Sequence, residues 1–269
     1  MSITDVPKGP FMMIMNFIGN DRQVMKLCIT NKKFYRWLSA YKFKSQVKLD
    51  SINKHQYFEN FTNIIATTES LYATARIKKH AKYALPKHTT KLEIVRTYCF
   101  NKKQKRQLLN TQQWINFPTW TNQLNYLTHL TIGFGLKIAP KVKLPKTVTH
   151  LTFKNHQPHN IDDVIHKQHG LISLKTSLRC NTDLLPKSLK ILYLDHLFEH
   201  GIRIINFLPD GLETLVLNDT QVLDGVIPNT VKTIVIGKHG TIDLNCIHHR
   251  VRVSVLDNVA KKVTATYIN

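Results

Sequence analysis

The sequence is poor in acidic residues, in cysteine and in long apolar runs. Only 17 Asp and Glu stand against 38 Lys and Arg in 269 residues, which gives a formal net charge of +21. The four cysteines are far apart and form no C-x-x-C pair, which argues against a disulfide framework and a zinc site and favours a reducing compartment. No run approaches the roughly eighteen apolar residues of a membrane span, and Phe11–Ile18 lacks a signal-peptide cleavage site. We therefore expect a soluble, cytoplasmic protein without membrane contact.

Motifs that mark catalysis are missing as well. There is no G-x-S-x-G, no phosphate loop and no H-E-x-x-H, so we predict no enzyme activity, no catalytic residue and no cofactor. Asp162 and Asp163 are followed by His166 and could bind a metal, but an exposed acidic loop explains them better. We predict no metal site.

What the sequence does contain is a repeat. An aliphatic residue and Pro are followed by aliphatic residues at the third, sixth and eighth positions after the Pro, as in Leu185–Leu194, Leu208–Leu217, Ile227–Ile236 and Leu144–Phe153. The last two aliphatics of successive copies recur every 19 to 23 residues. These pairs are Leu130/Ile132, Leu151/Phe153, Ile172/Leu174, Leu192/Leu194, Leu215/Leu217 and Ile234/Ile236. Val253/Val255 could be a further pair, and Leu92/Ile94 after Pro86 has the same frame.

A period of about 20 residues with L-x-x-L-x-L is the leucine-rich signature, in which stacked units bury their aliphatic edges against one another. Each final pair alternates with a period of two, which predicts a short strand, and Pro suits the turn before it. We predict an α/β repeat fold with short parallel strands. The alternative is that the spaced leucines mark a series of amphipathic helices.

The N-terminal residues have a different pattern. Phe11, Ile14, Met15 and Ile18 have the spacing of an amphipathic helix. Two further short helices are expected, with Asp21 and Thr30 as their N-caps. So small a unit cannot hold a core alone, and its apolar side chains could serve as core, as a docking surface, or as both.

These N-terminal residues resemble an F-box, in Val6-Pro7, the apolar run to Ile18, Val24–Cys28 and Asn31–Leu38. The Pro-led repeats resemble FNIP repeats, relatives of leucine-rich repeats. Together they resemble the F-box and FNIP repeat-containing proteins of giant DNA viruses and social amoebae. The family's Phe-Asn-x-Pro-Ile phrase is degraded here, and Lys8-Gly9-Pro10 replaces the usual acidic residue after Leu-Pro.

We predict four parts: residues 1–42 as an F-box-like helical segment, 43–122 as a connector with irregular early repeats, 123–258 as FNIP or leucine-rich-like repeats forming a solenoid, and 259–269 as a tail. Residues 43–83 and 98–122 match no part of the family pattern. The resemblance implies a non-catalytic substrate-recognition subunit of an SCF-type ubiquitin ligase. The partners would be a Skp-family adaptor, through it the cullin ligase, and a target protein. The expected adaptor contacts are Pro7, Phe11, Ile14, Ile18, Leu27 and Trp37.

If the paired aliphatics point inward, the alternate positions of each strand form an outer face that could bind the target. These candidates are His129, Thr131, His150, Thr152, Leu171, Ser173, Ile191, Tyr193, Thr214, Val216, Thr233 and Val235. A covering segment would instead make this face part of the core.

Two other functions stay open. A degenerate F-box that no longer docks would leave a protein that sequesters a host or viral protein through its repeats. The basic charge, concentrated in residues 1–110 and highest at Lys102–Arg106, would suit a nucleic-acid-associated protein. Aromatic residues do not interleave with these charges as stacking platforms would, so we do not expect nucleic acid as a partner.

Overall fold

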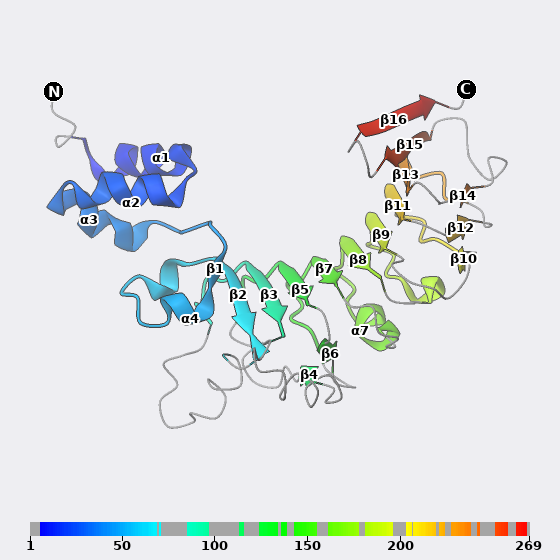
Figure 1. The fold of residues 1–269 in the computed structure, drawn as a ribbon, viewed down its shortest axis with the longest axis horizontal. Helices are drawn as coiled ribbons and strands as arrows, with labels where there is room; N and C mark the ends of the chain where they lie inside the picture. Colours follow the sequence, from blue (N-terminus) through cyan, green and yellow to red (C-terminus); the bar gives the residue numbers. More distant parts are fainter. Residues whose placement is uncertain are drawn as a thin grey trace, which may run out of the picture. The chain divides into compact units, whose positions relative to one another are not determined.

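The chain divides into two compact units in the computed structural model. Unit 1 comprises residues 1–97 and 120–127, and unit 2 comprises 98–119 and 128–269. Figure 1 shows the labelled helices and strands along the chain. The structure describes residues 6–68, 70, 85–96, 113–115, 124–133, 136–138, 143–154, 161–177, 181–195, 203–205, 207–218, 221–223, 227–237, 241–242, 251–257 and 262–267. The basic run 102–106 lies outside them. Across the described ranges, no helix has both the length and the apolar character needed to cross a membrane.

Unit 1 begins with three helices, α1 (Lys8–Ile18), α2 (Asp21–Ile29) and α3 (Lys32–Trp37). Gly19 ends α1 in the left-handed conformation at φ 65°, which glycine adopts without strain. The Asn20 side chain then accepts the Arg22 and Gln23 backbone N–H groups, and Asn31 caps α3 in the same way. The expected caps Asp21 and Thr30 were therefore each wrong by one residue, because amide side chains take both positions.

The three helices pack around aromatic rings. Phe11 and Phe34 stack with their ring centroids 4.0 Å apart, and the Trp37 ring lies against both. Met15 and Cys28 are fully buried beside them, with Sγ of Cys28 3.4 Å from Sδ of Met15.

The rest of unit 1 is a short parallel sheet with small helical turns. Its described elements are η2 (Leu38–Ala40), β1 (Val47–Lys48), α4 (Leu49–Ile52), η3 (Phe58–Asn60), β2 (Asn63–Thr67) and β3 (Lys91–Val95). The strands pair in the order β1-β2-β3, all parallel. Leu92 and Ile94 are buried on β3, as the repeat frame predicts.

Unit 2 is a repeat-like sheet with few helices. Its main sheet has the order β5-β7-β8-β9-β11-β13-β15, all parallel, and β16 pairs antiparallel with β15 at the end. The strands of this sheet are β5 (His129–Ile132), β7 (His150–Phe153), β8 (Ser173–Thr176), β9 (Ile191–Asp195), β11 (Thr214–Asn218), β13 (Thr233–Gly237), β15 (Arg252–Asp257) and β16 (Lys262–Tyr267).

Shorter elements follow several of these strands. β10 (Arg203–Ile205), β12 (Gln221–Leu223) and β14 (Thr241–Ile242) form a second parallel sheet, and β4 (Gln113–Ile115) pairs with β6 (Leu136–Ile138). Among the described residues of this unit, the helical elements are α7 (Asp162–His166) and η5 (Thr182–Leu184). The predicted parallel strands are thus confirmed as an α/β-like arrangement, and the alternative of amphipathic helices at the repeats is wrong.

The same turn precedes strand after strand. The carbonyls of Pro86, Pro145, Pro186, Pro209 and Pro228 each accept the backbone N–H three residues later, at 2.9–3.0 Å. We call each such turn with the strand that follows it a rung. Just before six of the described strands, one carbonyl accepts two N–H groups of the next rung. Lys190 O, for example, accepts from Glu213 N and Thr214 N, both at 2.9 Å. This repetition fixes the register between neighbouring rungs.

The side chains at the third, sixth and eighth positions after Pro fill the interior. Leu189, Leu192 and Leu194 are at most 1% exposed, and their counterparts in the next rung are fully buried. One rung departs from the predicted pairing. Leu174 aligns with Leu151 and Leu192, so the second inward residue of β8 is Thr176 and not Ile172.

Candidate functional site

The helical segment of unit 1 exposes an apolar stripe on α1. Phe17 is 93% exposed, Met13 74% and Ile14 42%, and Ile29 at the end of α2 is 63% exposed. Met13 and Ile14 precede Phe17 by four and three residues, so all three lie on one side of the helix, whereas Phe11 and Met15 point into the core. Side chains this apolar and this exposed on one short helix make the stripe a candidate interaction surface.

The predicted adaptor residues divide between this surface and the core. Pro7 and Ile14 are exposed, and Ile18, Leu27 and Trp37 are half-buried. Phe11 is fully buried against Phe34, so the expectation that it contacts a partner is corrected: it builds the helical core.

Met13 and Phe17 are not among the contact residues predicted from the sequence, because that prediction assigns a single apolar face to α1. The signal was present in the sequence, since Phe11–Ile18 has apolar residues on both sides of the helix and a single polar one, Asn16. One buried face needs fewer apolar residues than this run supplies.

The outer face of the main sheet in unit 2 consists of two columns of aligned side chains. The first column holds His129, His150, Ser173, Ile191, Thr214 and Thr233, and the second holds Thr131, Thr152, Lys175, Tyr193, Val216 and Val235. All are half-buried except Val216, which is only 8% exposed between Tyr193 and Val235. The predicted orientation of the alternate positions is therefore found along the sheet.

The prediction that Leu171 lies on this face is wrong. This residue is fully buried because it takes the third position of the turn, where Leu171 N bonds to Gln168 O at 3.1 Å. Gln168 thus stands where other rungs have Pro. Its side-chain amide donates to Pro145 O and Val148 O of the rung before, at 2.9 and 3.1 Å.

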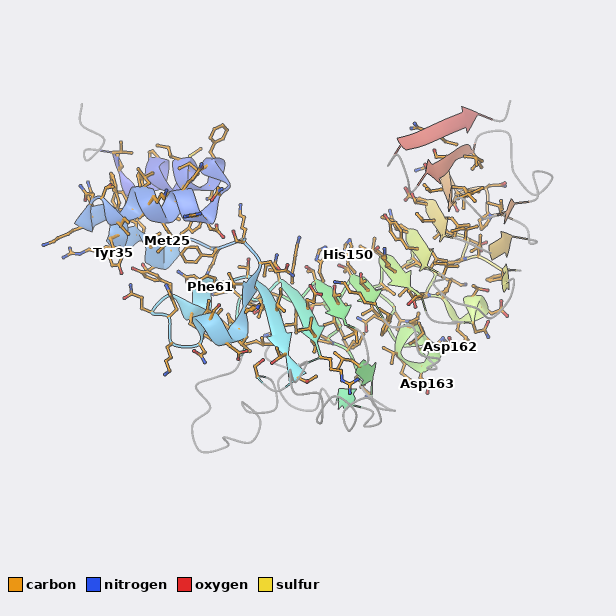
Figure 2. All side chains as sticks on the ribbon, in the orientation of Figure 1. Met25, Tyr35, Phe61, His150, Asp162 and Asp163 are labelled. Carbon is orange, nitrogen blue, oxygen red and sulfur yellow. The ribbon has the colours of Figure 1, made fainter. Side chains whose placement is uncertain are left out.

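The part of the outer face on β5 to β9 carries polar and aromatic groups. The rings of His129 and His150 stack with centroids 4.1 Å apart and planes within 11°, and Nδ1 of each lies 2.9 Å from the hydroxyl of the preceding Thr. Figure 2 labels His150 on this sheet. Further along the sheet, Lys175 Nζ lies 5.8 Å from the Tyr193 ring centroid. Hydroxyls, imidazoles and an aromatic ring in two columns provide hydrogen-bonding groups and flat contact surfaces.

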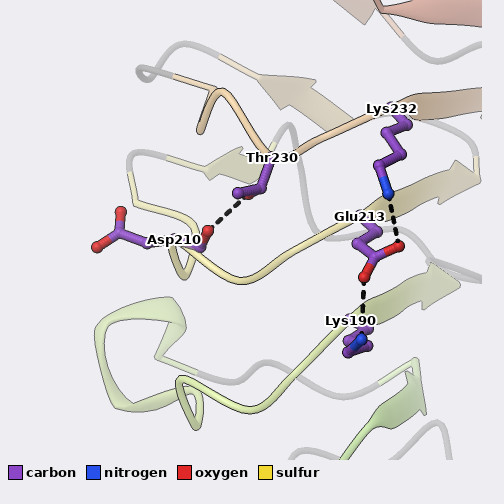
Figure 3. Close-up of polar contacts among 5 residues, drawn as sticks. All are labelled: Lys190, Asp210, Glu213, Thr230 and Lys232. Carbon is purple, nitrogen blue, oxygen red and sulfur yellow. Dashed lines mark hydrogen bonds and ion pairs between the residues drawn. The ribbon is translucent and has the colours of Figure 1, made fainter.

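A charged bridge joins three rungs beside this sheet. Glu213 pairs with Lys190 through Oε1 and with Lys232 through Oε2, each at 3.1 Å (Figure 3). Hydrogen bonds from these two ammonium groups hold the pKa of the Glu213 carboxyl below its ordinary value. The bridge ties neighbouring rungs together.

Side chains that commonly bind metals are scattered in the described part of the chain. No cluster of three or more His, Cys, Asp or Glu side chains occurs among these residues. Asp162 and Asp163 are the first two residues of α7 (Figure 2). Oδ1 of Asp162 accepts a hydrogen bond from the Asn181 N–H at 2.8 Å, so this carboxylate joins the start of α7 to the segment before η5. Burial raises the pKa of the Cys28 thiol to about 11, so it stays protonated and unreactive at neutral pH.

Comparisons with protein-family models, curated proteins and solved structures find no match to this chain.

Proposed function

We propose that this chain is a non-catalytic substrate-recognition subunit of an SCF-type ubiquitin ligase that acts in the cytoplasm. In this proposal α1–α3 are an F-box-like segment that docks on a Skp-family adaptor, and the parallel rungs are a leucine-rich-repeat-like solenoid that holds a target protein. Such a subunit makes no bond itself. It raises the effective concentration of target lysines near the ubiquitin-charged enzyme.

The exposed stripe of α1 is the observation that carries the proposal. The interior of the helical segment is already filled by Phe11, Phe34 and Met15, so Met13 and Phe17 have no use in folding this segment. Leaving a side chain such as Phe17 in water forgoes about 1.5–3 kcal/mol that its burial would contribute. A partner with an apolar groove recovers that energy, and exposed aromatic and aliphatic anchors are what hot spots at interfaces consist of.

The outer face of the main sheet is the proposed target surface. It has regularly spaced hydroxyl, imidazole and aromatic groups, and it excludes Leu171, which lies in the core. Thr152 is half-buried on β7, the second strand of this sheet, so Thr152→Arg would place a bulky cation on the face while Leu151 and Phe153 keep their interior positions.

Binding of a purified Skp-family adaptor tests the first half of the proposal. Phe17→Asp should weaken binding by at least about a hundredfold, as expected for loss of an interface anchor. Phe207→Asp is the matched control, because Phe207 is 51% exposed and lies in unit 2. Circular dichroism should be unchanged in both variants. Adaptor binding by Phe17→Asp at wild-type strength, or none by the wild type, would refute the assignment.

Co-purification with mass spectrometry tests the second half. Thr152→Arg should lose the co-purifying target and keep the adaptor, whereas Phe17→Asp should do the reverse. A target that is retained by Thr152→Arg binds elsewhere, and the sheet face is then not the recognition surface.

A further inference from the structure

The exposed charge of the helical segment has one sign. Residues 6–44 contain eight basic side chains and one acidic side chain, a net charge of +7 by subtraction. Seven of the eight are exposed, and Lys42 is half-buried. The basic residues are Lys8, Arg22, Lys26, Lys32, Lys33, Arg36, Lys42 and Lys44.

The one carboxylate of this stretch is not on the surface. Asp21 is 7% exposed, and its oxygens accept the Tyr41 hydroxyl at 2.8 Å and the Ser45 N–H at 2.6 Å. Its charge is therefore used inside the unit. A partner that approaches α1–α3 meets an apolar stripe and a surface whose exposed charges within residues 6–44 are all positive.

We propose that the α1 stripe docks into an apolar groove bordered by carboxylates on an acidic protein partner. This inference rests on the proposed function and gives the chemistry of the adaptor surface that the chain recognises. The apolar side chains hold the complex together, and the cations speed its formation. Complementary charge acts mainly on the association rate, which it raises by about 10- to 1,000-fold at low salt.

An anionic membrane surface would also attract apolar and basic groups, but the placement of the charges favours a protein. A helix that lies in the lipid interface carries Lys or Arg along its own polar face. Here α1 has a single basic residue, Lys8, at its first position, and its polar side is Gly9 and Asn16. The cations belong to α2, α3 and the segment after them.

Association kinetics with the purified adaptor test the inference. For the full-length chain, the association rate constant should fall about tenfold or more between 50 and 500 mM NaCl, with the dissociation rate constant nearly unchanged. Arg22→Glu/Lys32→Glu should slow association about tenfold at 50 mM NaCl and flatten the salt dependence. Both positions lie in the first turns of α2 and α3, where a carboxylate suits the helix dipole, so folding should be preserved.

Two controls separate the contributions. Lys54→Glu reverses an exposed charge outside residues 6–44 and should change the association rate less than twofold. Phe17→Asp should act mainly on the dissociation rate, because it removes an apolar contact.

The outcomes distinguish this inference from the proposed function. Tight adaptor binding that is lost in Phe17→Asp, but is insensitive to salt and to Arg22→Glu/Lys32→Glu, overturns the acidic groove and leaves the proposed function standing. No adaptor binding at any salt concentration overturns both. Wild-type binding to phosphatidylserine vesicles that is lost in Phe17→Asp assigns the stripe to a membrane and overturns the inference.

Discussion

The hydroxyl of Tyr41 donates a hydrogen bond to the buried carboxylate of Asp21, with 2.8 Å between the two oxygens. Asp21 begins α2, and Tyr41 lies just after the three helices, so this contact fastens the end of the helical segment to its middle. Asn60 adds a second link within unit 1, since its amide donates to Leu38 O at 2.9 Å and to Ser39 O at 3.0 Å. Buried polar contacts of this kind fix one arrangement of the segments that they join.

Tyr41→Phe should therefore destabilise unit 1 by about 1–3 kcal/mol, because the buried carboxylate keeps only the Ser45 N–H as a donor. Hydrogen exchange followed by mass spectrometry should show faster exchange in residues 8–40. Tyr35→Phe is the control, since the exposed Tyr35 hydroxyl accepts a hydrogen bond from Gln56 at the surface. Equal exchange in the two variants would show that the Asp21 contact does not stabilise the segment.

Gly211→Ala should destabilise unit 2 by about 1–3 kcal/mol through overpacking. A Cβ at Gly211 would lie 2.6 Å from the backbone oxygen of Lys187, which the repeated turn holds in place. Gly170→Ala is the matched variant in another rung, where the nearest atom would be 3.8 Å away. Its effect should be neutral, or stabilising by up to about 1 kcal/mol, because Ala loses less chain entropy on folding. Urea unfolding of both variants measures the difference, and similar midpoints would contradict the close approach.

Leu171→Ala should destabilise unit 2 by about 2–5 kcal/mol, because it opens a cavity at a fully buried position. Ile191→Ala, on the half-buried outer face, should cost only about 1 kcal/mol. Thermal and urea unfolding of the two variants compare two aliphatic residues that alternation alone places on the same face. A larger loss for Ile191→Ala would reverse the assignment of the faces.

The bridge around Glu213 predicts a dependence of stability on pH. Its pKa is lowered in the folded protein by Lys190 and Lys232 from an ordinary value of 4.5. The stabilisation is therefore present above pH 4.5 and is lost as the pH falls through the lower folded pKa. Glu213→Gln should lower the melting temperature slightly at pH 7, and the difference from the wild type should vanish in strong acid.

Asp210→Asn is the control for this experiment. Asp210 takes part in the neighbouring contact through its backbone oxygen, which accepts the Thr230 hydroxyl at 2.6 Å (Figure 3). Its substitution removes the same charge and should leave the pH profile of stability unchanged. A difference between Glu213→Gln and the wild type that persists undiminished in strong acid would contradict the assignment to the charge pair.

The repeat could be predicted from sequence because its turn and its strand both leave local marks. Pro begins the turn, and the paired aliphatics define a strand of period two. The rung at Leu171 shows the limit of this reasoning. Gln168 replaces Pro and a buried Thr176 replaces the last aliphatic, so local pattern matching selects the wrong pair. The frame itself, which requires an aliphatic three residues before the pair, fits Leu171 and Leu174 better.

The helical surface was harder to predict for a different reason. Spacing identifies α1 as a helix, but it does not say which of its apolar sides is covered. That depends on the packing of Phe34 and Trp37 from α3, which local spacing does not encode. The position of Phe17 in solvent could be learned only from the three-dimensional arrangement.

The carbonyls that accept two N–H groups of the next rung affect how the number of repeats in such a chain can change in evolution. Each of them binds the backbone of the following unit and needs no particular side chain there. Duplication or deletion of one whole unit would leave the remaining junctions chemically the same. The array could thus grow or shorten by single gene-segment copying events, and the breadth of its outer surface would change without a new fold.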